Sequence, residues 1–117
     1  MSQDVVEFST DIGTGIGTSE NNDINIGDEY SVEFDIDKEL RIGGNAKKVL
    51  GKDYFIRYSN DKNEIQGCVD GVDEDGMIYF RLSPSCLIMI ESSEDEISTS
   101  DFLLLTVNVE DLKITRI

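Results

Sequence analysis

Hydrophobic and polar positions alternate along much of this chain, and the alternation is clearest in residues 29–37. Tyr30, Val32, Phe34 and Ile36 occupy every second position, and the positions between them are acidic or serine. A period of two is typical of a β-strand that buries one of its faces. The pattern therefore predicts a half-buried strand over residues 29–37.

Four further segments of similar character follow at short intervals. The connections between them, Ser59–Asn63, Gly71–Gly76 and Ser83–Ser85, are rich in residues that favour turns. Connections this short join antiparallel neighbours, so the pattern predicts a four-strand meander. Its strands are expected at 53–58, 64–70, 77–82 and 86–91.

The remaining elements are predicted from apolar runs and capping residues. An asparagine and a glycine at its two ends favour a short helix over residues 45–51. Residues 9–28 are rich in Gly, Ser, Thr, Asn and Asp and predict a long polar loop, with a short ribbon at 24–26. The polar segment 92–100 is expected to carry a helical turn capped at Ser93. Further strands are expected at 3–8, 102–109 and 112–117.

These elements together predict the fold class. A chain of 117 residues supports one hydrophobic core, so we expect a single domain spanning residues 1–117. Its mostly β content favours an antiparallel sandwich or a partly open barrel that contains the meander and one or two short helical turns. No apolar run approaches the roughly 18 residues of a membrane-spanning helix. The N-terminus also lacks the basic start of a secretory signal, so we expect a cytoplasmic protein.

The register of the meander predicts which side chains share its core face. Centring each hairpin on its turn pairs Tyr54 with Cys68. It also places Tyr79 opposite Cys68 on one side and Met89 on the other. Cys68 and Cys86 then lie on opposite faces, beyond disulfide reach, and we expect two free thiols. The core face is predicted to contain Phe55, Ile65, Gly67, Val69, Ile78, Phe80, Leu82, Cys86, Ile88 and Ile90.

The second face of the meander mixes tyrosine, methionine and arginine. These residue types are enriched at the centres of protein interfaces. The face is predicted to hold Tyr54, Ile56, Tyr58, Gln66, Cys68, Asp70, Met77, Tyr79, Arg81, Leu87 and Met89. It is expected either to bind a partner or to be covered by another element as the second layer of a sandwich. The candidate partner-binding residues are Tyr54, Tyr58, Tyr79, Arg81 and Met89, with the acidic rim Asp70, Asp73, Glu74 and Asp75.

Acidic residues dominate the composition. There are 25 Asp and Glu residues against 10 Lys and Arg and no histidine, which gives a net charge of −15. The excess is spread along the chain, with 12 acids and 6 bases in residues 1–59 and 13 acids and 4 bases in residues 60–117. Such a field maintains solubility, repels nucleic acid and anionic lipid, and attracts basic partners. We therefore expect a basic protein partner, and no nucleic-acid or membrane partner.

The residue types present exclude several kinds of catalytic site. Without histidine, no histidine-based triad or His-containing zinc site can form, and two cysteines cannot supply a four-thiolate site. The glycines at 13, 15 and 17 lack the further glycine of a dinucleotide fingerprint and the lysine of a P-loop. The acidic segments 70–76 and 23–28 could offer oxygens to calcium, although neither has the spacing of an EF-hand. We expect no catalytic residues, cofactor or metal, and therefore not an enzyme.

A family resemblance agrees with the charge. Tyr30-Ser-Val-Glu-Phe-Asp-Ile, Tyr79-Phe-Arg-Leu-Ser and Cys86-Leu-Ile-Met-Ile-Glu resemble strands of small all-β immunity proteins from bacterial polymorphic toxin and contact-dependent inhibition systems. The resemblance implies an immunity protein, or toxin inhibitor, that binds a cognate toxin domain such as a basic nuclease and occludes its active site. It assigns no individual binding residue.

Two other functions remain open from the sequence. Glu33, Asp35 and Asp37 would lie about 7 Å apart along a strand, similar to neighbouring phosphates of a nucleic-acid backbone. An acidic nucleic-acid mimic should continue such a stripe across the domain, whereas an inhibitor needs only a patch. The third hypothesis is a small calcium-stabilised β module.

Overall fold

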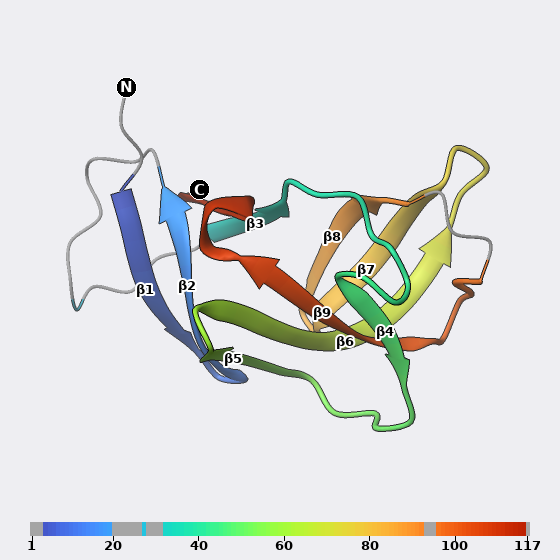
Figure 1. The fold of residues 1–117 in the computed structure, drawn as a ribbon, viewed down its shortest axis with the longest axis horizontal. Coiled ribbons are helices and arrows are strands. Elements are labelled where there is room, and N and C mark those ends of the chain that lie inside the picture. The colour runs from blue at the N-terminus through green and yellow to red at the C-terminus, as the bar shows by residue number, and fades with distance from the viewer. Residues whose placement is uncertain (1–3, 20–26, 28–31, 93–95, 117) are drawn as a thin grey trace.

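The structure, a computed structural model, describes residues 4–19, 27, 32–92 and 96–116 (Figure 1). These residues form ten strands and one 3-10 turn, so the prediction of a mostly β fold is confirmed. The elements are β1 (Asp4–Thr10), β2 (Gly13–Ser19), β3 (Val32–Ile36), β4 (Ala46–Val49), β5 (Phe55–Ser59), β6 (Lys62–Val72), β7 (Met77–Ser83), β8 (Cys86–Glu91), β9 (Phe102–Asn108), η1 (Val109–Asp111) and β10 (Leu112–Arg116).

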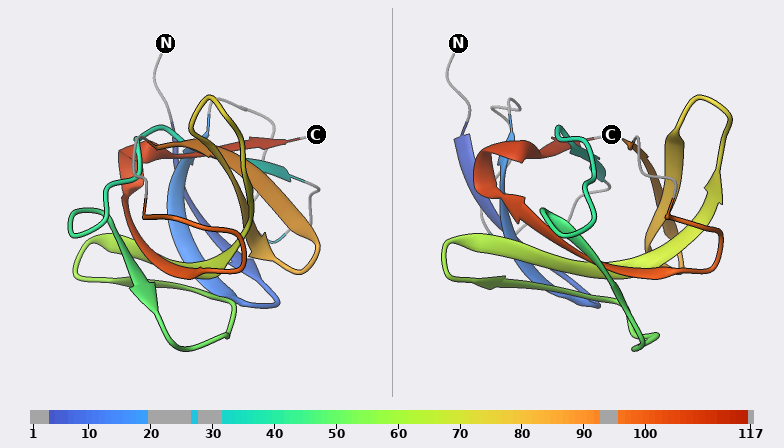
Figure 2. Two further views of the ribbon diagram at one scale, coloured as in Figure 1. Left: turned by 90° about the vertical axis from the view of Figure 1, so that its right-hand side faces the viewer. Right: turned by 45° about the vertical axis from the view of Figure 1, so that its right-hand side comes forward.

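The strands form one curled sheet in the order β3-β10-β2-β5-β6-β7-β8 (Figures 1 and 2). An isolated bridge joins Leu40, which follows β3, to Ser92, which follows β8. There the Leu40 N–H donates to the carbonyl of Glu91 at 2.8 Å, and the Ser92 hydroxyl donates to the Leu40 carbonyl at 3.0 Å. The sheet is therefore a partly open barrel, which is one of the two architectures that the sequence predicted. It is mixed, because β2 lies parallel to both β5 and β10.

The long strand β6 organises the meander. Its first half pairs with β5 and its second half with β7 along one edge, while β9 pairs with residues 62–68 on the other edge. Cys68 lies at the changeover and pairs with both Arg81 and Phe102. The apolar strand β9 lies between β6 and β4.

The predicted register holds for β7 and β8, where Tyr79 lies opposite Met89. Between β6 and β7 the pairing is displaced and a bulge follows Val69, but Val69 and Phe80 still share the core face. Between β5 and β6 the prediction is wrong by one residue, which exchanges the two faces of β5.

A tight turn explains the exchange in β5. The turn contains only Asn60 and Asp61, with φ of 55° and 63°, and Ser59 pairs directly with Lys62. Two left-handed residues are typical of the two-residue turn that matches the twist of a hairpin. Ile56 is therefore buried opposite Ile65, and the predictions that Ile56 lies outside and Phe55 inside are wrong.

The prediction of a short helix over residues 45–51 is wrong, because residues 46–49 form strand β4, which pairs with the edge of β9. The Asn45 side chain accepts the Arg41 N–H at 2.8 Å and donates to the Glu39 carbonyl at 3.0 Å. Its backbone carbonyl accepts the N–H of Thr106 at 2.8 Å. Asn45 therefore ends a turn and starts a strand, and the edge of β9 gains hydrogen-bond partners.

The predicted loop over residues 9–28 is also wrong, because residues 13–19 form strand β2. Its glycines fit where neighbouring groups approach closely. A Cβ atom at Gly15 would lie 2.6 Å from the Phe8 ring, and one at Gly17 would lie 2.7 Å from the Leu112 carbonyl oxygen. The expected ribbon at 24–26 and the cap at Ser93 fall outside the described residues, and the described part of the strand expected at 29–37 is β3.

Candidate functional site

The outer surface of β7 and β8 is the candidate site. Along β7 the side chains of Ile78, Phe80 and Leu82 are buried, and the residues between them point outward. Along β8, Ile88 and Ile90 are buried in the same alternation. We call the outer surface and its turn the acidic face, which comprises Asp70, Asp73, Glu74, Asp75, Met77, Tyr79, Arg81, Leu87, Met89 and Glu91.

The centre of the acidic face is apolar and open to solvent. Met89 is 60% exposed and Leu87 is 45% exposed. Met89 lies directly opposite Tyr79, and Leu87 lies opposite Arg81. The alternative in which another element covers this face does not hold at these positions, and the exposed cluster remains available for a partner.

Tyr79 is positioned by its own strand neighbours. It pairs with Gly71, and a Cβ atom at Gly71 would lie 3.6 Å from the Tyr79 ring. The ring thus lies over a residue without a side chain, which accounts for its half-buried state. Its hydroxyl donates to Asp73 Oδ2 at 3.1 Å, and this hydrogen bond together with the Asp73 charge raises the pKa of Tyr79.

Asp73 shapes the turn beside Tyr79. Its Oδ1 accepts the backbone N–H of Met77 at 3.0 Å and that of Asp75 at 2.9 Å. These donors, led by Met77 and joined by the Tyr79 hydroxyl, lower the pKa of Asp73 against the opposing effect of desolvation. Asp73 is therefore a structural carboxylate, and the exposed Glu74 and Asp75 project from the turn that it holds.

Arg81 is neutralised within the acidic face. Its guanidinium lies 3.2 Å from Asp70 Oδ1, and its Nη1 donates to the carbonyl of Pro84 at 3.1 Å. Asp70 reaches it from the bulge between Val69 and Gly71. With Arg81 paired in this way, the carboxylates of the turn and of Glu91 give the face its negative charge.

Two of the predicted site residues lie elsewhere. Tyr54 packs edge-on against Phe102 with ring centroids 5.5 Å apart, over the strands β6 and β9. Tyr58 pairs with Asn63 on β6, whereas Tyr79 pairs with Gly71 on the same strand. Asn63 and Gly71 are eight residues apart, which corresponds to about 26 Å of extended strand. The structure therefore brings together Tyr79, Arg81, Met89 and the four rim acids, and it separates Tyr58 from them. Tyr54 lies beside the acidic face, against the Phe102 that pairs with Cys68.

Cys68 and Cys86 are free thiols on opposite faces of the sheet. Cys86 packs against the core, whereas Cys68 lies beside Arg81 on the outer surface. Burial is the main cause that raises the pKa of both thiols. Neither microenvironment favours a reactive thiolate.

Two of the candidate calcium ligands in the segment 70–76 are engaged by protein groups. Asp73 accepts three hydrogen bonds and Asp70 pairs with Arg81. Within the described ranges, no group of three or more acidic or cysteine side chains could hold a metal ion. Most of the second acidic segment, 23–28, falls outside those ranges.

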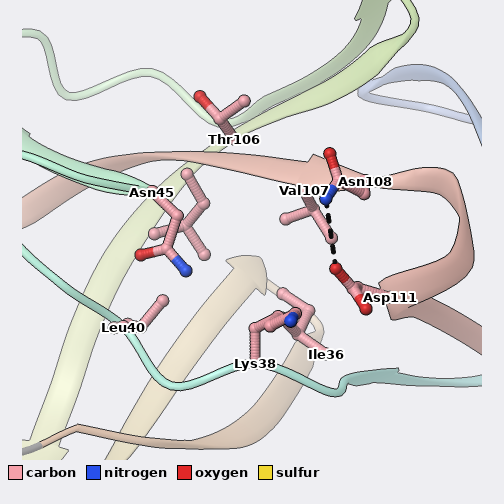
Figure 3. A pocket seen from close by; sticks show the side chains of 9 residues that line it. Ile36, Lys38, Leu40, Asn45, Thr106, Val107, Asn108 and Asp111 are labelled. Carbon is pink, nitrogen blue, oxygen red and sulfur yellow. Dashed lines mark hydrogen bonds between the residues drawn. The ribbon is translucent and has the colours of Figure 1, made fainter.

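A small pocket lies between the segment 36–45 and β9 (Figure 3). Its volume is about 100 Å³. The amide of Asn45 is used by Arg41 and Glu39, and Asp111 Oδ2 accepts from the Asn108 amide at 3.4 Å. These polar atoms therefore serve the local backbone and turn, and they form no catalytic constellation.

The acidic stripe on β3 ends at the next strand. Glu33, Asp35 and Asp37 are exposed as predicted. On β10, however, Lys113 lies opposite Asp35 and Thr115 lies opposite Glu33. A patch of acid is present there, but not the continuous stripe that a nucleic-acid mimic requires.

Sequence reasoning missed the uneven distribution of the bases. Five of the ten, Lys38, Arg41, Lys47, Lys48 and Lys52, occur within residues 38–52, which contain only one acid. Counting charge in windows of about fifteen residues instead of in halves would have found this segment. The exposed apolar residue within it, Leu50, gives no sequence pattern of its own.

Comparison with known proteins adds no relative. No protein-family model, curated protein or solved structure matches the chain. In the part of the chain that the structure describes, no helix has both the length and the apolar character needed to cross a membrane. Geometry and charge therefore carry the functional inference.

Proposed function

We propose that this protein binds and occludes a basic protein partner through the acidic face, as a stoichiometric inhibitor and not as an enzyme. The observation that carries the proposal is an exposed apolar centre, Met89 and Leu87, bordered by carboxylates. An immunity protein that blocks a basic toxin domain in the cytoplasm has this chemistry.

The two parts of the face would contribute differently to binding. Exposed rim acids such as Glu74 and Asp75 attract a basic partner and raise the association rate. Central residues that lose water on docking, such as Met89, mainly set the dissociation rate. A basic surface with an apolar residue at its centre would satisfy both parts.

The acidic patch favours an inhibitor over a nucleic-acid mimic. On β10, Lys113 lies opposite Asp35 and interrupts the carboxylates of β3. Within the acidic face the one basic residue is Arg81, and Asp70 neutralises it. A compact partner surface suits this arrangement better than an extended charged groove.

The proposal is tested with the product of the gene next to this one. The two proteins are produced together, and activity of the neighbouring protein and the rate constants of complex formation are measured. Met89→Asp should raise the dissociation rate at least tenfold and weaken inhibition, because it places a charge in the apolar centre. Met89 is a cleaner probe than Tyr79, whose hydroxyl also holds Asp73.

Val5→Asp is the matched control, because Val5 is an apolar residue on β1 that is 68% exposed and lies outside the acidic face. It should bind like the parent protein. Equal effects of the two substitutions, or binding that is indifferent to salt, would contradict the proposed face.

A further inference from the structure

The chain carries a basic arm, defined as residues 38–52, that contrasts with the rest of the molecule. The arm holds five bases and one acid, so its charge is +4, whereas the remaining residues carry −19. It leaves the barrel after β3, forms β4 on the edge of β9 and returns toward β5. In Figure 2 the loop after β4 stands out from the barrel in both views.

The tip of the basic arm presents an apolar side chain among cations. Leu50 is 99% exposed, so it contacts essentially nothing in its own chain. Lys47 and Lys52 are exposed on either side of it and make no ion pair with a described residue. Lys48 is held by Asp101 at 3.4 Å, which anchors the arm behind its tip.

This tip has the chemistry that the acidic face fits, namely a basic surface with an apolar anchor. We infer that the basic arm of one copy docks on the acidic face of a second copy, with Leu50 against Met89 and Leu87. The inference rests on the acidic face being a binding face, as proposed above. Leu50 does not reach the face of its own chain, because it is fully exposed there.

The contact is head-to-tail, since two different surfaces meet. Such contacts close into rings or continue as open chains, depending on the rotation between copies. The net charge of −15 on each copy opposes the approach at low salt. At about 0.15 M salt the screening length is about 8 Å, so distant repulsion fades while lysine–carboxylate pairs in contact persist. Association should therefore be weakest at low salt and strengthen toward physiological salt.

Sedimentation velocity and light scattering of the purified full chain test the inference. The parent protein should form concentration-dependent assemblies near physiological salt. Leu50→Asp places a charge at the apolar tip of the basic arm, and Met89→Asp places one in the apolar centre of the acidic face. Each variant therefore lacks one of the two docking surfaces and should stay monomeric on its own. Mixed in equal amounts, they should form a one-to-one heterodimer that grows no further, because each retains one functional surface. Val5→Asp should assemble like the parent.

Three results would overturn the inference. A parent protein that stays monomeric at every concentration excludes self-docking, and assembly of both variants like the parent places the interface elsewhere. Co-sedimentation of the monomer with anionic phosphatidylserine vesicles, lost in Leu50→Asp, would make the arm a membrane-docking element instead. Melting curves check that both variants fold, as substitution of such exposed residues should allow.

Failure here is distinguishable from failure of the proposed function. Leu50→Asp leaves the acidic face intact and free of the basic arm of another copy, so it should bind the basic partner at least as tightly as the parent protein does. If Met89→Asp loses partner binding but the parent protein shows no self-assembly, the proposed function stands and only the self-docking is rejected.

Discussion

At the scale of single residues, Asp73 links the acidic face to the stability of its turn. Its carboxylate accepts two backbone N–H groups and the Tyr79 hydroxyl. A carboxylate with a lowered pKa stabilises the fold in its charged form. The residue that gives the face part of its charge is thus also the residue that holds its shape.

Asp73→Asn should lower the melting temperature at neutral pH. The stabilisation from Asp73 is fully present above its unfolded pKa of about 3.9 and is lost as the pH falls through the lowered folded pKa. The difference between variant and parent should therefore persist down to about pH 4 and shrink below it. Thermal unfolding followed by circular dichroism over pH 2–7 measures this difference.

Glu74→Gln is the matched control for that series, because Glu74 lies beside Asp73 and is exposed. It should leave the melting temperature nearly unchanged at neutral pH. A difference between Asp73→Asn and the parent that stays constant at all pH values would refute the assigned role of the charge.

At the scale of elements, one side chain joins three strands inside the barrel. Asn63 is fully buried, and its Oδ1 accepts the N–H of Ile16 at 2.8 Å. Its Nδ2 donates to the carbonyls of Ile16 at 2.6 Å and Val107 at 3.3 Å. Asn63 on β6 therefore provides hydrogen bonds to backbone groups of both β2 and β9. Its bonds to β2 connect two strands that are not paired with each other in the sheet.

Asn63→Ala should destabilise the fold by about 2–4 kcal/mol. It leaves the Ile16 N–H without this acceptor and opens a cavity, and an unsatisfied buried group alone costs about 1–3 kcal/mol. Asn63→Asp should be at least as harmful, because a carboxylate cannot donate to the two carbonyls and is a buried charge. Urea unfolding monitored by circular dichroism measures both.

Ser59→Ala serves as the control in the same hairpin, because Ser59 is exposed. It should change the free energy of unfolding by less than about 0.5 kcal/mol. Equal values for Asn63→Ala and Ser59→Ala would show that the hydrogen bonds of Asn63 do not hold β2 in place.

At the scale of the whole molecule, the net charge of −15 opposes folding. Compaction brings like charges together, and the described ion pairs are few and largely exposed. Self-repulsion should therefore outweigh the attraction within these pairs. The charge that attracts a basic partner is maintained at a cost in stability.

The melting temperature should therefore rise as sodium chloride increases from about 0.01 M to about 0.15 M, where the screening length falls from about 30 Å to about 8 Å. Differential scanning calorimetry measures the shift. A variant with Glu33→Lys and Asp35→Lys, both at exposed positions of β3, is less acidic, so its melting temperature should respond less to salt. A melting temperature that falls with salt would show that ion pairs dominate.

The strands whose alternation is local were predictable from the amino-acid sequence. The period of two predicted β3 and the meander, and the turn at Ser83–Ser85 was enough to place Tyr79 opposite Met89. These features depend on residues within one hairpin, because a face that must be buried specifies its own register. That Tyr79, Arg81 and Met89 share one face was predictable for the same reason, whereas the sequence left open whether that face is exposed.

Other features depend on neighbours that are distant in the sequence, so they became evident only in the folded chain. The glycine-rich β2 is a strand because Phe8 and Leu112 approach it closely, and β4 is a strand because the edge of β9 accepts it. Strand preference of such segments comes from packing and pairing more than from their own residues. The separation of Tyr58 from the acidic face likewise follows from the length of β6, which no local pattern records.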